Sequence, residues 1–443
     1  MKRFFLLISA LLLFSSCSIQ DGDGLMRAPK PPIVYEELRG PLQAVMGDGY
    51  EYAMTSSGDN RESTQTVNLT GAGSGEALVI LRSKATSFLS VHIFTKESGE
   101  FVYAGAIENN CSAIDSIAYA DLMGEGGLDI VIAWRESGLR SLTVHSIDEG
   151  EPVPLLQSTE ISEFCLLPKS EITELMLFTQ NSALGSAAEL YSLNGNLLMP
   201  ISSAPLSSTI GELKQVYTGA LSDGSDAVFV TSSYQSTNFV TDVITYGGGS
   251  LSNITLNKDS GISDTTVSKI EEYPSNVEFP SDRVPVVGVP VAEFLPAYDP
   301  MDEEYADNPI YKLIWKSFDS AGQESIAAET YRSLTGSWRL YLPEEWRGRI
   351  TVSRPDVPDR RFVNVTFALW SDDSPPVDIV TLRTIQKTSN MTNIDRTGMF
   401  SLFSNTNIEV LAALIPGAPD IGGFELTKEE LLSRVKPIAP KWK

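Results

Sequence analysis

The chain is poor in the residues that build the commonest catalytic and metal-binding sites. Its 443 residues include only two histidines and three cysteines. His92 and His145 are far apart in the sequence, and Cys111 and Cys165 lack the close spacing of zinc ligands. The sequence also lacks a phosphate-binding loop, a dinucleotide fingerprint and a G-x-S-x-G elbow. These absences exclude the enzyme classes that a short motif identifies.

Basic residues are scarce as well, 33 against 57 acidic residues, which gives a formal net charge of −24. Because such a chain is repelled by a phosphate backbone, we expect no nucleic-acid partner. Three cysteines are too few for a disulfide framework, so Cys111 and Cys165 are either buried thiols, which we favour, or one disulfide. The composition, 42% hydrophobic and 20% charged, is typical of a folded protein, and the length predicts at least two domains.

Long apolar runs are missing, and the one at residues 4–14 is too short to span a bilayer. It follows Lys2 and Arg3 and precedes small residues, which is typical of a signal peptide, here residues 1–16. The sequence Leu-Phe-Ser-Ser-Cys at 13–17 resembles the lipobox of bacterial lipoproteins. The resemblance implies cleavage before Cys17 and a lipid on its thiol. The alternative is an ordinary signal peptide with an incidental cysteine.

A lipid on Cys17 would place the protein at the extracytoplasmic face of the cell membrane. The residues that follow are polar, then rich in proline, and we expect residues 17–34 to be a linker between the anchor and the fold. Without Lys2 and Arg3 the mature net charge would be about −26.

Two segments, 68–80 and 121–133, align without a gap at an offset of 53 residues. Each is a glycine-rich turn followed by an apolar strand. At the same offset His92 matches His145, which indicates that the two histidines pack between strands and do not catalyse. Weaker copies follow, so that carboxylates recur at positions 76, 129, 174, 226 and 278. Such a period, made only of short strands, predicts a mainly β fold with a β-propeller of about 5–6 blades over residues 35–325.

The second of these turns, Asp-x-x-Gly-x-Gly-x-x-Asp at 121–129, resembles the FG-GAP or VCBS-type propeller repeat. Residues 29–77 are similar to a group of exported lipoproteins common in Clostridia-type bacteria. The residues that carry this similarity are Pro29-Lys-Pro-Pro32, Gly58-Asp-Asn-Arg61, Gln65 and Leu69-Thr-Gly71-x-Gly73-x-x-Glu76. The resemblance implies a fold and a location, and it implies no activity.

Related repeats often hold Ca²⁺ in this turn, which makes Asp121, Glu125 and Asp129 candidate ligands. Calcium prefers six to eight oxygen ligands, and Met123 stands where one is expected. The alternative, which we favour, is that the glycines turn the chain and the acidic residues cap backbone amides. Apart from this candidate site for Ca²⁺, we expect no cofactor.

The charge changes toward the C-terminus. Residues 331–443 hold 15 basic and 13 acidic residues, whereas residues 17–330 carry a net charge of −28. This contrast predicts a domain boundary, with a small α+β domain at residues 326–443. Alternating patterns predict strands at 337–342, 349–352, 362–370, 377–384 and 398–403, and a capping box at 427–430 predicts a helix to about residue 435.

Six arginines lie between positions 339 and 361. Among them, Arg347, Arg349 and Arg354 are candidates for contact with an anionic cell-wall polymer or with lipid headgroups. The alternative, which we favour, is that the arginines dock against the acidic part of the chain or pair with nearby carboxylates.

Together these features predict a membrane-tethered surface lipoprotein that binds or scaffolds envelope components, such as a cell-wall polymer or an envelope protein, without catalysis. The alternative is an exported hydrolase or lyase that acts on glycan or peptide through two carboxylates, since such a pair leaves no motif in the sequence.

Overall fold

The structure is a computed structural model that describes residues 33–73, 75–169, 172–181, 185–278, 284–301, 305, 309–333, 335, 337–353, 361–387 and 394–438. The chain is mainly β, and its contacts divide it into two compact units. Unit 1 holds the described residues up to Glu160, with Lys169–Thr173 and Leu193–Leu197, and unit 2 holds the others. None of the described helices is long and apolar enough to cross a membrane.

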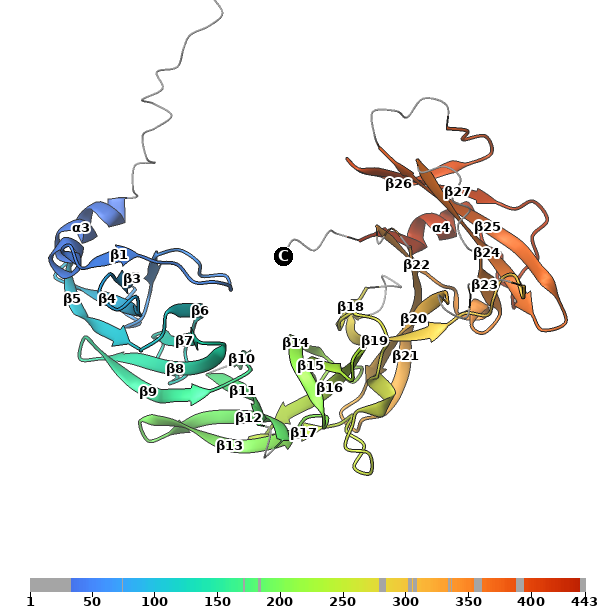
Figure 1. The fold of residues 1–443 in the computed structure, drawn as a ribbon. Helices are drawn as coiled ribbons and strands as arrows, with labels where there is room; N and C mark the ends of the chain where they lie inside the picture. Colours follow the sequence, from blue (N-terminus) through green and yellow to red (C-terminus); the bar gives the residue numbers. More distant parts are fainter. Residues whose placement is uncertain are drawn as a thin grey trace, which may run out of the picture. The chain divides into compact units, whose positions relative to one another are not determined.

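Unit 1 begins with helix α3 and a five-stranded sheet (Figure 1). The elements are α3 (Ile33–Met46), β1 (Tyr50–Tyr52), β2 (Thr64–Val67), β3 (Glu76–Ser83), β4 (Leu89–Glu97) and β5 (Glu100–Glu108). The helix buries Leu38 and Leu42 against Val79, Leu81 and Phe94 of the sheet. Pro41 lies inside this helix and removes one of its backbone hydrogen bonds, and burial of the apolar side chains stabilises the helix in spite of that loss.

The second sheet of unit 1 contains β6 (Ala113–Ala120), β7 (Asp129–Glu136), β8 (Leu139–Asp148) and β9 (Glu151–Glu160), hydrogen-bonded in chain order. A shared core joins it to the first sheet, with Leu78 and Ile80 on one side and Ile130, Ile132 and Trp134 on the other. All five side chains are fully buried or nearly so.

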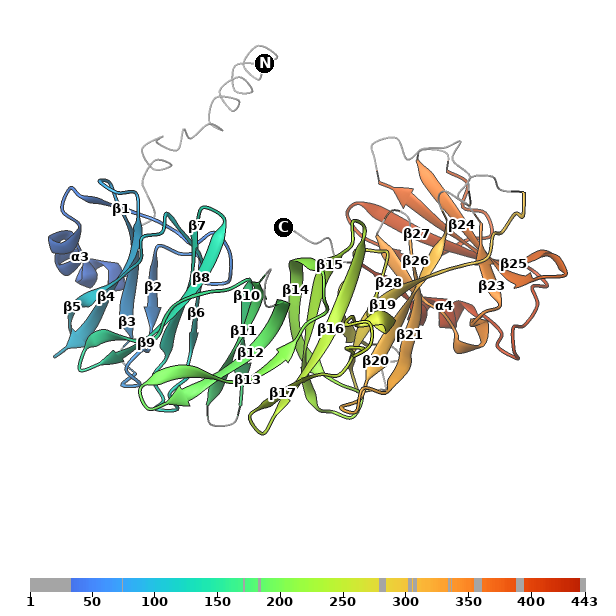
Figure 2. The same ribbon diagram turned by 60° about the horizontal axis from the view of Figure 1, so that its bottom comes forward.

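Two four-stranded sheets follow, and most of their residues belong to unit 2; Figure 2 shows the strands of each sheet side by side in chain order. One contains β10 (Glu163–Pro168), β11 (Thr173–Asn181), β12 (Gly185–Asn194) and β13 (Leu197–Pro205); the other contains β14 (Ile210–Ala220), β15 (Asp226–Tyr234), β16 (Asn238–Gly247) and β17 (Ser250–Asn253). Met176 and Phe178 of the first sheet meet Val228, Val230 and Ile244 of the second in one apolar core.

A six-stranded sheet follows the short 3₁₀ helix η1 (Asp264–Thr266). Its strands are β18 (Ser275–Val277), β19 (Val286–Phe294), β20 (Tyr311–Phe318), β21 (Glu324–Arg332), β22 (Trp338–Tyr341) and β28 (Val435–Pro437). Val287 and Val289 pack on Phe229 of the preceding sheet. Strand β28 pairs with β22 although about 95 residues separate them in the sequence.

The last sheet follows a 3₁₀ turn, η2 (Glu344–Trp346), and precedes helix α4 (Lys428–Arg434). Its strands are β23 (Ile350–Val352), β24 (Phe362–Ser371), β25 (Ser374–Gln386), β26 (Phe400–Ser404) and β27 (Ile408–Leu414), with β27 between β25 and β26. Trp338 and Trp346 share a core with Phe367 and Val410 of this sheet and with Leu431 of α4.

The predicted C-terminal α+β domain is not supported as a separate body. The expected boundary between residues 325 and 326 falls inside β21, which is hydrogen-bonded on both sides. The C-terminal strand β28 belongs to the same sheet, and α4 is the one α-helix in the described residues after 326. The individual elements predicted there are confirmed within about three residues at each end, including the helix, whose Thr427 hydroxyl caps the Glu430 amide at 3.2 Å.

Candidate functional site

The aligned turns hold equivalent buried carboxylates. Glu76 and Asp129 are the first residues of β3 and β7, and 1% and 3% of their surfaces are exposed. The Leu69 amide donates to Glu76 Oε2 at 2.7 Å, and the Leu122 amide donates to Asp129 Oδ2 at 2.8 Å. Leu69 and Leu122 are also 53 residues apart. The repeat therefore conserves a carboxylate that closes the turn before its strand.

The later copies follow this pattern unevenly. Asp226 begins β15, and Glu174 is the second residue of β11. Glu278, by contrast, follows β18 and begins no strand.

The candidate Ca²⁺ ligands have backbone partners. Both carboxylate oxygens of Asp121 accept amide hydrogens of the turn, from Gly124 at 2.6 Å and Gly126 at 2.9 Å. Burial raises the pKa of Asp129, while its hydrogen bonds to Leu122 and Ser146 oppose that rise. Asp129 and Glu125 line a small cavity of about 260 Å³, but no three acidic, histidine or cysteine side chains in the described ranges are grouped to hold a metal ion. The capping alternative accounts for the hydrogen bonds of Asp121 and Asp129.

The two histidines lie in different sheets of unit 1, His92 on β4, where it is buried, and His145 on β8, where it is partly exposed. His92 Nε2 is 2.9 Å from the Ser90 hydroxyl, and its Nδ1 is 3.3 Å from the Tyr103 hydroxyl. Desolvation lowers the pKa of both His92 and His145 to about 4, so both are neutral at pH 7. Their strand registers differ, because His92 pairs with Val79 whereas His145 pairs with Ile130. A shift of two residues keeps both side chains on equivalent faces.

Both described cysteines are free thiols, which removes the disulfide alternative for Cys111 and Cys165. Burial raises the pKa of each thiol, and the nearby Glu136 and Glu163 carboxylates act in the same direction. Cys17 lies outside the described residues.

Two of the six arginines, Arg339 and Arg347, pair with carboxylates of the acidic part of the chain. Arg347 Nε is 2.5 Å from Glu329, and Arg339 lies 3.3 Å from Glu272 and stacks over the Trp315 ring at 4.5 Å. These partners are distant in the sequence, so local charge spacing could not identify them. Arg354 lies outside the described residues, and Arg349 follows the Arg347 turn.

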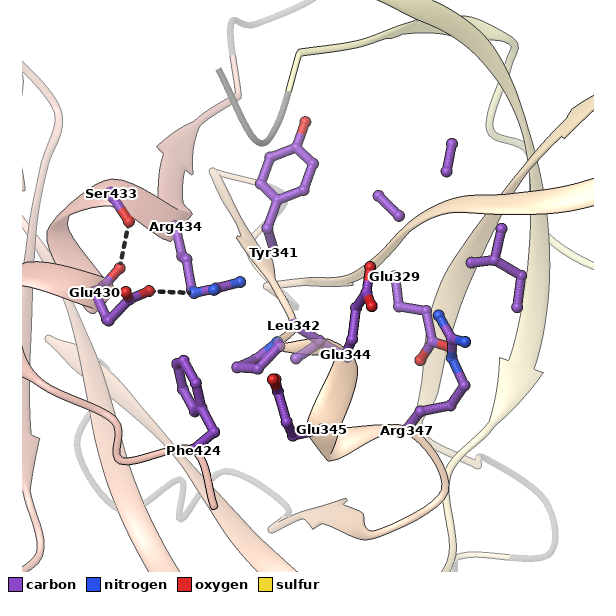
Figure 3. A pocket seen from close by; sticks show the side chains of 14 residues that line it. Glu329, Tyr341, Leu342, Glu344, Glu345, Arg347, Phe424, Glu430, Ser433 and Arg434 are labelled. Atoms are coloured by element: carbon purple, nitrogen blue, oxygen red, sulfur yellow. Dashed lines mark hydrogen bonds and ion pairs between the residues drawn. The ribbon is translucent and has the colours of Figure 1, made fainter. Parts of the chain in front are cut away.

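A pocket of about 430 Å³ lies in unit 2 beside this pairing (Figure 3). Strand β21, the end of β22, the η2 turn and helix α4 all contribute to its wall. Its titratable side chains are Glu329, Tyr341, Glu344, Glu345, Arg347, Glu430 and Arg434, and Phe424 and Leu342 add apolar surface. We call it the glutamate pocket.

Three ion pairs, two of them formed by Glu329 and one by Glu430, set the electrostatics of the glutamate pocket. Glu329 is buried, and its two oxygens contact different cations, Oε1 with Arg347 and Oε2 with Lys312 Nζ at 2.6 Å. On α4, Arg434 Nε is 2.8 Å from Glu430 Oε2, four residues earlier. In Figure 3 the side chains of Glu344 and Glu345 lie between the Glu329–Arg347 pair and the Glu430–Arg434 pair.

The sequence missed this pocket because its members come from positions 326–347 and 424–434, separated by a whole sheet. With four carboxylates to two guanidinium groups, its lining is acidic overall and can bind cationic or hydroxyl-bearing groups. One signal was present in the sequence. The capping box at 427–430 marks the start of α4, the helix that carries Glu430 and Arg434.

No family model matches the chain, and no curated protein matches it. Similar solved structures include a Bacteroides uniformis protein provisionally named a 6-phosphogluconolactonase, 10% identical, with 73% of this chain and 86% of that chain covered and a TM-score of 0.31. The exotype rhamnogalacturonan lyase YesX is 11% identical, with 74% of this chain and 65% of that chain covered and a TM-score of 0.29. Sqt1 of Chaetomium thermophilum is 10% identical, with 84% of this chain and 99% of that chain covered and a TM-score of 0.32. At these TM-scores the similarities assign this chain to no family and to no activity.

Proposed function

We propose that this chain is a surface lipoprotein, anchored through Cys17 at the extracytoplasmic face of the membrane, that binds an envelope component without catalysis. The signal layout of residues 1–17 and the strong acidity of the chain support the location. The glutamate pocket supports the binding role.

We also propose that the sheets are propeller blades of the FG-GAP or VCBS type, about 5–6 in number. Three of the sheets, β6–β9, β10–β13 and β14–β17, are four-stranded and hydrogen-bonded in chain order, as blades are. The matching turn carboxylates Glu76 and Asp129 support a common origin for the first two units of the repeat.

The binding role rests on the ion pairs of Glu329, which engage both of its carboxylate oxygens. A carboxylate that donates or accepts a proton during hydrolysis needs an oxygen turned toward the substrate. Each oxygen of Glu329 is already in contact with a cation, and Glu430 is held by Arg434. Side chains fixed in this way form a preorganised surface for recognition.

The ligand would be a cell-wall polymer or an envelope protein with cationic or hydroxyl groups. The lining carries more negative than positive charge, which disfavours a polyanion inside the pocket. Contact of Arg347, Arg349 and Arg354 with an anionic polymer would therefore have to take place outside the pocket. Arg347 keeps 46% of its side chain exposed.

The test is a pull-down from labelled envelope with residues 18–443 as bait. We expect a reproducible ligand whose recovery falls at least fivefold in the Glu344→Gln/Glu345→Gln variant. The control is Asp148→Asn/Glu151→Gln, which removes two exposed carboxylates from unit 1. Equal loss in both variants, or no recovered ligand, would refute the proposal for this pocket.

The second candidate function is a hydrolase or lyase for glycan or peptide. It is favoured by the presence of four glutamates in one pocket, because glycan hydrolysis uses a pair of carboxyl groups. Incubation with peptidoglycan and with plant and bacterial polysaccharides, followed by mass spectrometry, tests it. Product release that disappears in both Glu344→Gln and Glu345→Gln would favour the enzyme.

The anchor is tested separately. Expression of the full chain in a bacterium should give a membrane-bound product with a lipid mass on Cys17, and Cys17→Ser should release it from the membrane. Membrane association unchanged by Cys17→Ser would contradict the anchor while leaving the pocket proposal intact.

A further inference from the structure

Unit 2 contains a second cavity, of about 660 Å³, away from the residues of the glutamate pocket. Two segments form it, the chain after β19 at 296–300 and the hairpin between β24 and β25 at 370–376. Tyr298 and Trp370 supply its aromatic rings, and both are partly buried. We call it the Trp370 groove.

Hydrogen bonds hold both walls of the Trp370 groove in place. The Thr351 hydroxyl donates to the carbonyl of Pro296 at 2.7 Å, and the Trp370 amide donates to the carbonyl of Arg349 at 2.8 Å. The Tyr298 hydroxyl donates to Asp378 Oδ1 at 2.7 Å. The groove is therefore largely preformed, as small-molecule sites usually are.

The lining has no cationic donor, and its neutral side-chain donors include the Trp370 indole N–H and the Ser371 and Ser374 hydroxyls. Four of its residues are prolines, which have no amide hydrogen, and none is lysine or arginine. The hydrogen bond to Asp378 and burial raise the pKa of Tyr298 to about 12, so its one proton stays committed to that bond at neutral pH. A surface without a cationic side chain and with carboxylates in its lining disfavours an anion.

Three aspartates, Asp299, Asp372 and Asp373, complete the lining. Asp372 and Asp373 form the exposed turn of the hairpin next to Trp370, and Asp299 accepts the Met301 amide at 2.9 Å. Aromatic faces attract cations through their quadrupole, and nearby carboxylates add to that attraction. The apolar prolines and the rings suit a ligand whose charge is carried on methyl or methylene groups.

We propose that the Trp370 groove binds an organic cation, an ammonium or quaternary ammonium group on a small apolar body. The cation lies against the Trp370 and Tyr298 rings, and the Asp372 and Asp373 carboxylates balance its charge. This site is independent of the glutamate pocket and of the function proposed for it.

The test compares choline with its uncharged isostere 3,3-dimethylbutan-1-ol by titration calorimetry on residues 18–443. We expect millimolar or tighter binding of choline, at least fivefold weaker binding of the isostere, and weakening of choline binding by added salt. Chitotetraose serves as a neutral saccharide probe for the same rings.

Three variants locate the site. Trp370→Leu should weaken choline binding at least tenfold and Asp372→Asn/Asp373→Asn at least threefold, whereas Tyr298→Phe keeps the ring and should change it less than twofold. Asp148→Asn/Glu151→Gln, with the same charge change in unit 1, should have no effect. Thermal melts and far-UV circular dichroism check that each variant folds.

Equal binding of choline and the isostere, or choline binding unchanged by Trp370→Leu in a folded variant, would overturn the proposal. Binding of chitotetraose but not of choline would also overturn it, and would make the groove a saccharide site.

Discussion

Lys312 Nζ lies 2.6 Å from Glu329 Oε2, and only 3% and 5% of the two side chains are exposed. The two residues pair across neighbouring strands β20 and β21, and Glu329 also holds Arg347 at the glutamate pocket. The wall of that pocket is thus continuous with a charged pair in the interior of the sheet.

Removal of one partner of this pair should be more harmful than removal of both. Lys312→Met leaves a buried carboxylate with one cation fewer, and we expect a loss of about 3 kcal/mol in the free energy of unfolding. Lys312→Met/Glu329→Leu removes both charges and should recover at least half of that loss. Urea unfolding of the two variants measures the difference, and equal losses would show that the pair is not coupled.

The two glycine turns of the repeat touch each other, which makes one glycine far less replaceable than another. A Cβ at Gly127 would lie 2.4 Å from the Leu69 carbonyl oxygen, whereas one at Gly73 would meet nothing within 4 Å. We expect Gly127→Ala to destabilise unit 1 by about 2–4 kcal/mol.

Gly73→Ala is the matched control, with a cost of about 1 kcal/mol from its φ of +74° alone. Similar melting temperatures for the two variants would mean that the contact between the turns does not persist in solution.

The free energy of unfolding should decrease as the pH is lowered from about 6.5 toward 4, because of the two histidines. His92 and His145 have a folded-state pKa of about 4 against about 6.5 when unfolded. The unfolded chain therefore takes up more protons between these values, so the stabilisation is complete above pH 6.5 and decreases as the pH falls toward 4.

Each histidine should contribute about 1–3 kcal/mol to this decrease. Urea unfolding at pH 7 and pH 5 measures it, and His92→Gln/His145→Gln should flatten the profile. If the free energy of unfolding of the variant fell between pH 7 and pH 5 as much as that of the original chain, the pH dependence would come from other groups.

Calcium should have little effect on unit 1. The Asp121 oxygens already accept three turn amides, and Asp129 accepts the Leu122 amide, so a metal ion would have to displace these bonds. We expect a change of less than 1 °C in melting temperature between 5 mM EDTA and 5 mM Ca²⁺. A rise of several degrees that Asp121→Asn abolishes would restore the Ca²⁺ site.

A tryptophan–threonine hydrogen bond recurs in the cores of both units. The Trp338 indole N–H donates to the Thr384 hydroxyl at 2.7 Å, and Trp134 and Trp315 form the same bond with Thr143 and Thr330. Thr384→Val keeps the shape but leaves a buried donor unsatisfied, at a cost of about 1–3 kcal/mol. Thr384→Ser keeps the hydroxyl and should cost less; the reverse order in chemical denaturation would contradict the role of the bond.

The sequence predicted the structure best where the spacing of residues repeats together with the strands. The offset of 53 residues places Glu76 and Asp129 at the same structural position, because turn length and strand length both recur. Strands β22 to β26 of the C-terminal segment were predictable from their alternation, whereas β27 and β28 were not predicted. The copy at Glu278 was not a strand start, because a single acidic residue before apolar residues is a weak marker.

Other elements depend on partners that no local pattern reveals. Helix α3 was not predicted, since Pro41 interrupts its pattern and its stability comes from the sheet beneath it. The strand order that inserts β27 beside β25 was equally hidden. The charge step near residue 330 predicts a domain boundary, and Arg339 and Arg347 form ion pairs across this step with Glu272 and Glu329. Local charge counts could not reveal these ion pairs, because their partners are distant in the sequence.

The pairing of β28 with β22 has a consequence for biosynthesis. Leu340 faces Val435, so one margin of the six-stranded sheet is open until residue 437 has left the ribosome. Until then the nascent chain presents an unpaired strand that other chains could bind. A ribosome-stalled product that ends before residue 435 should therefore be more prone to self-association than the finished protein.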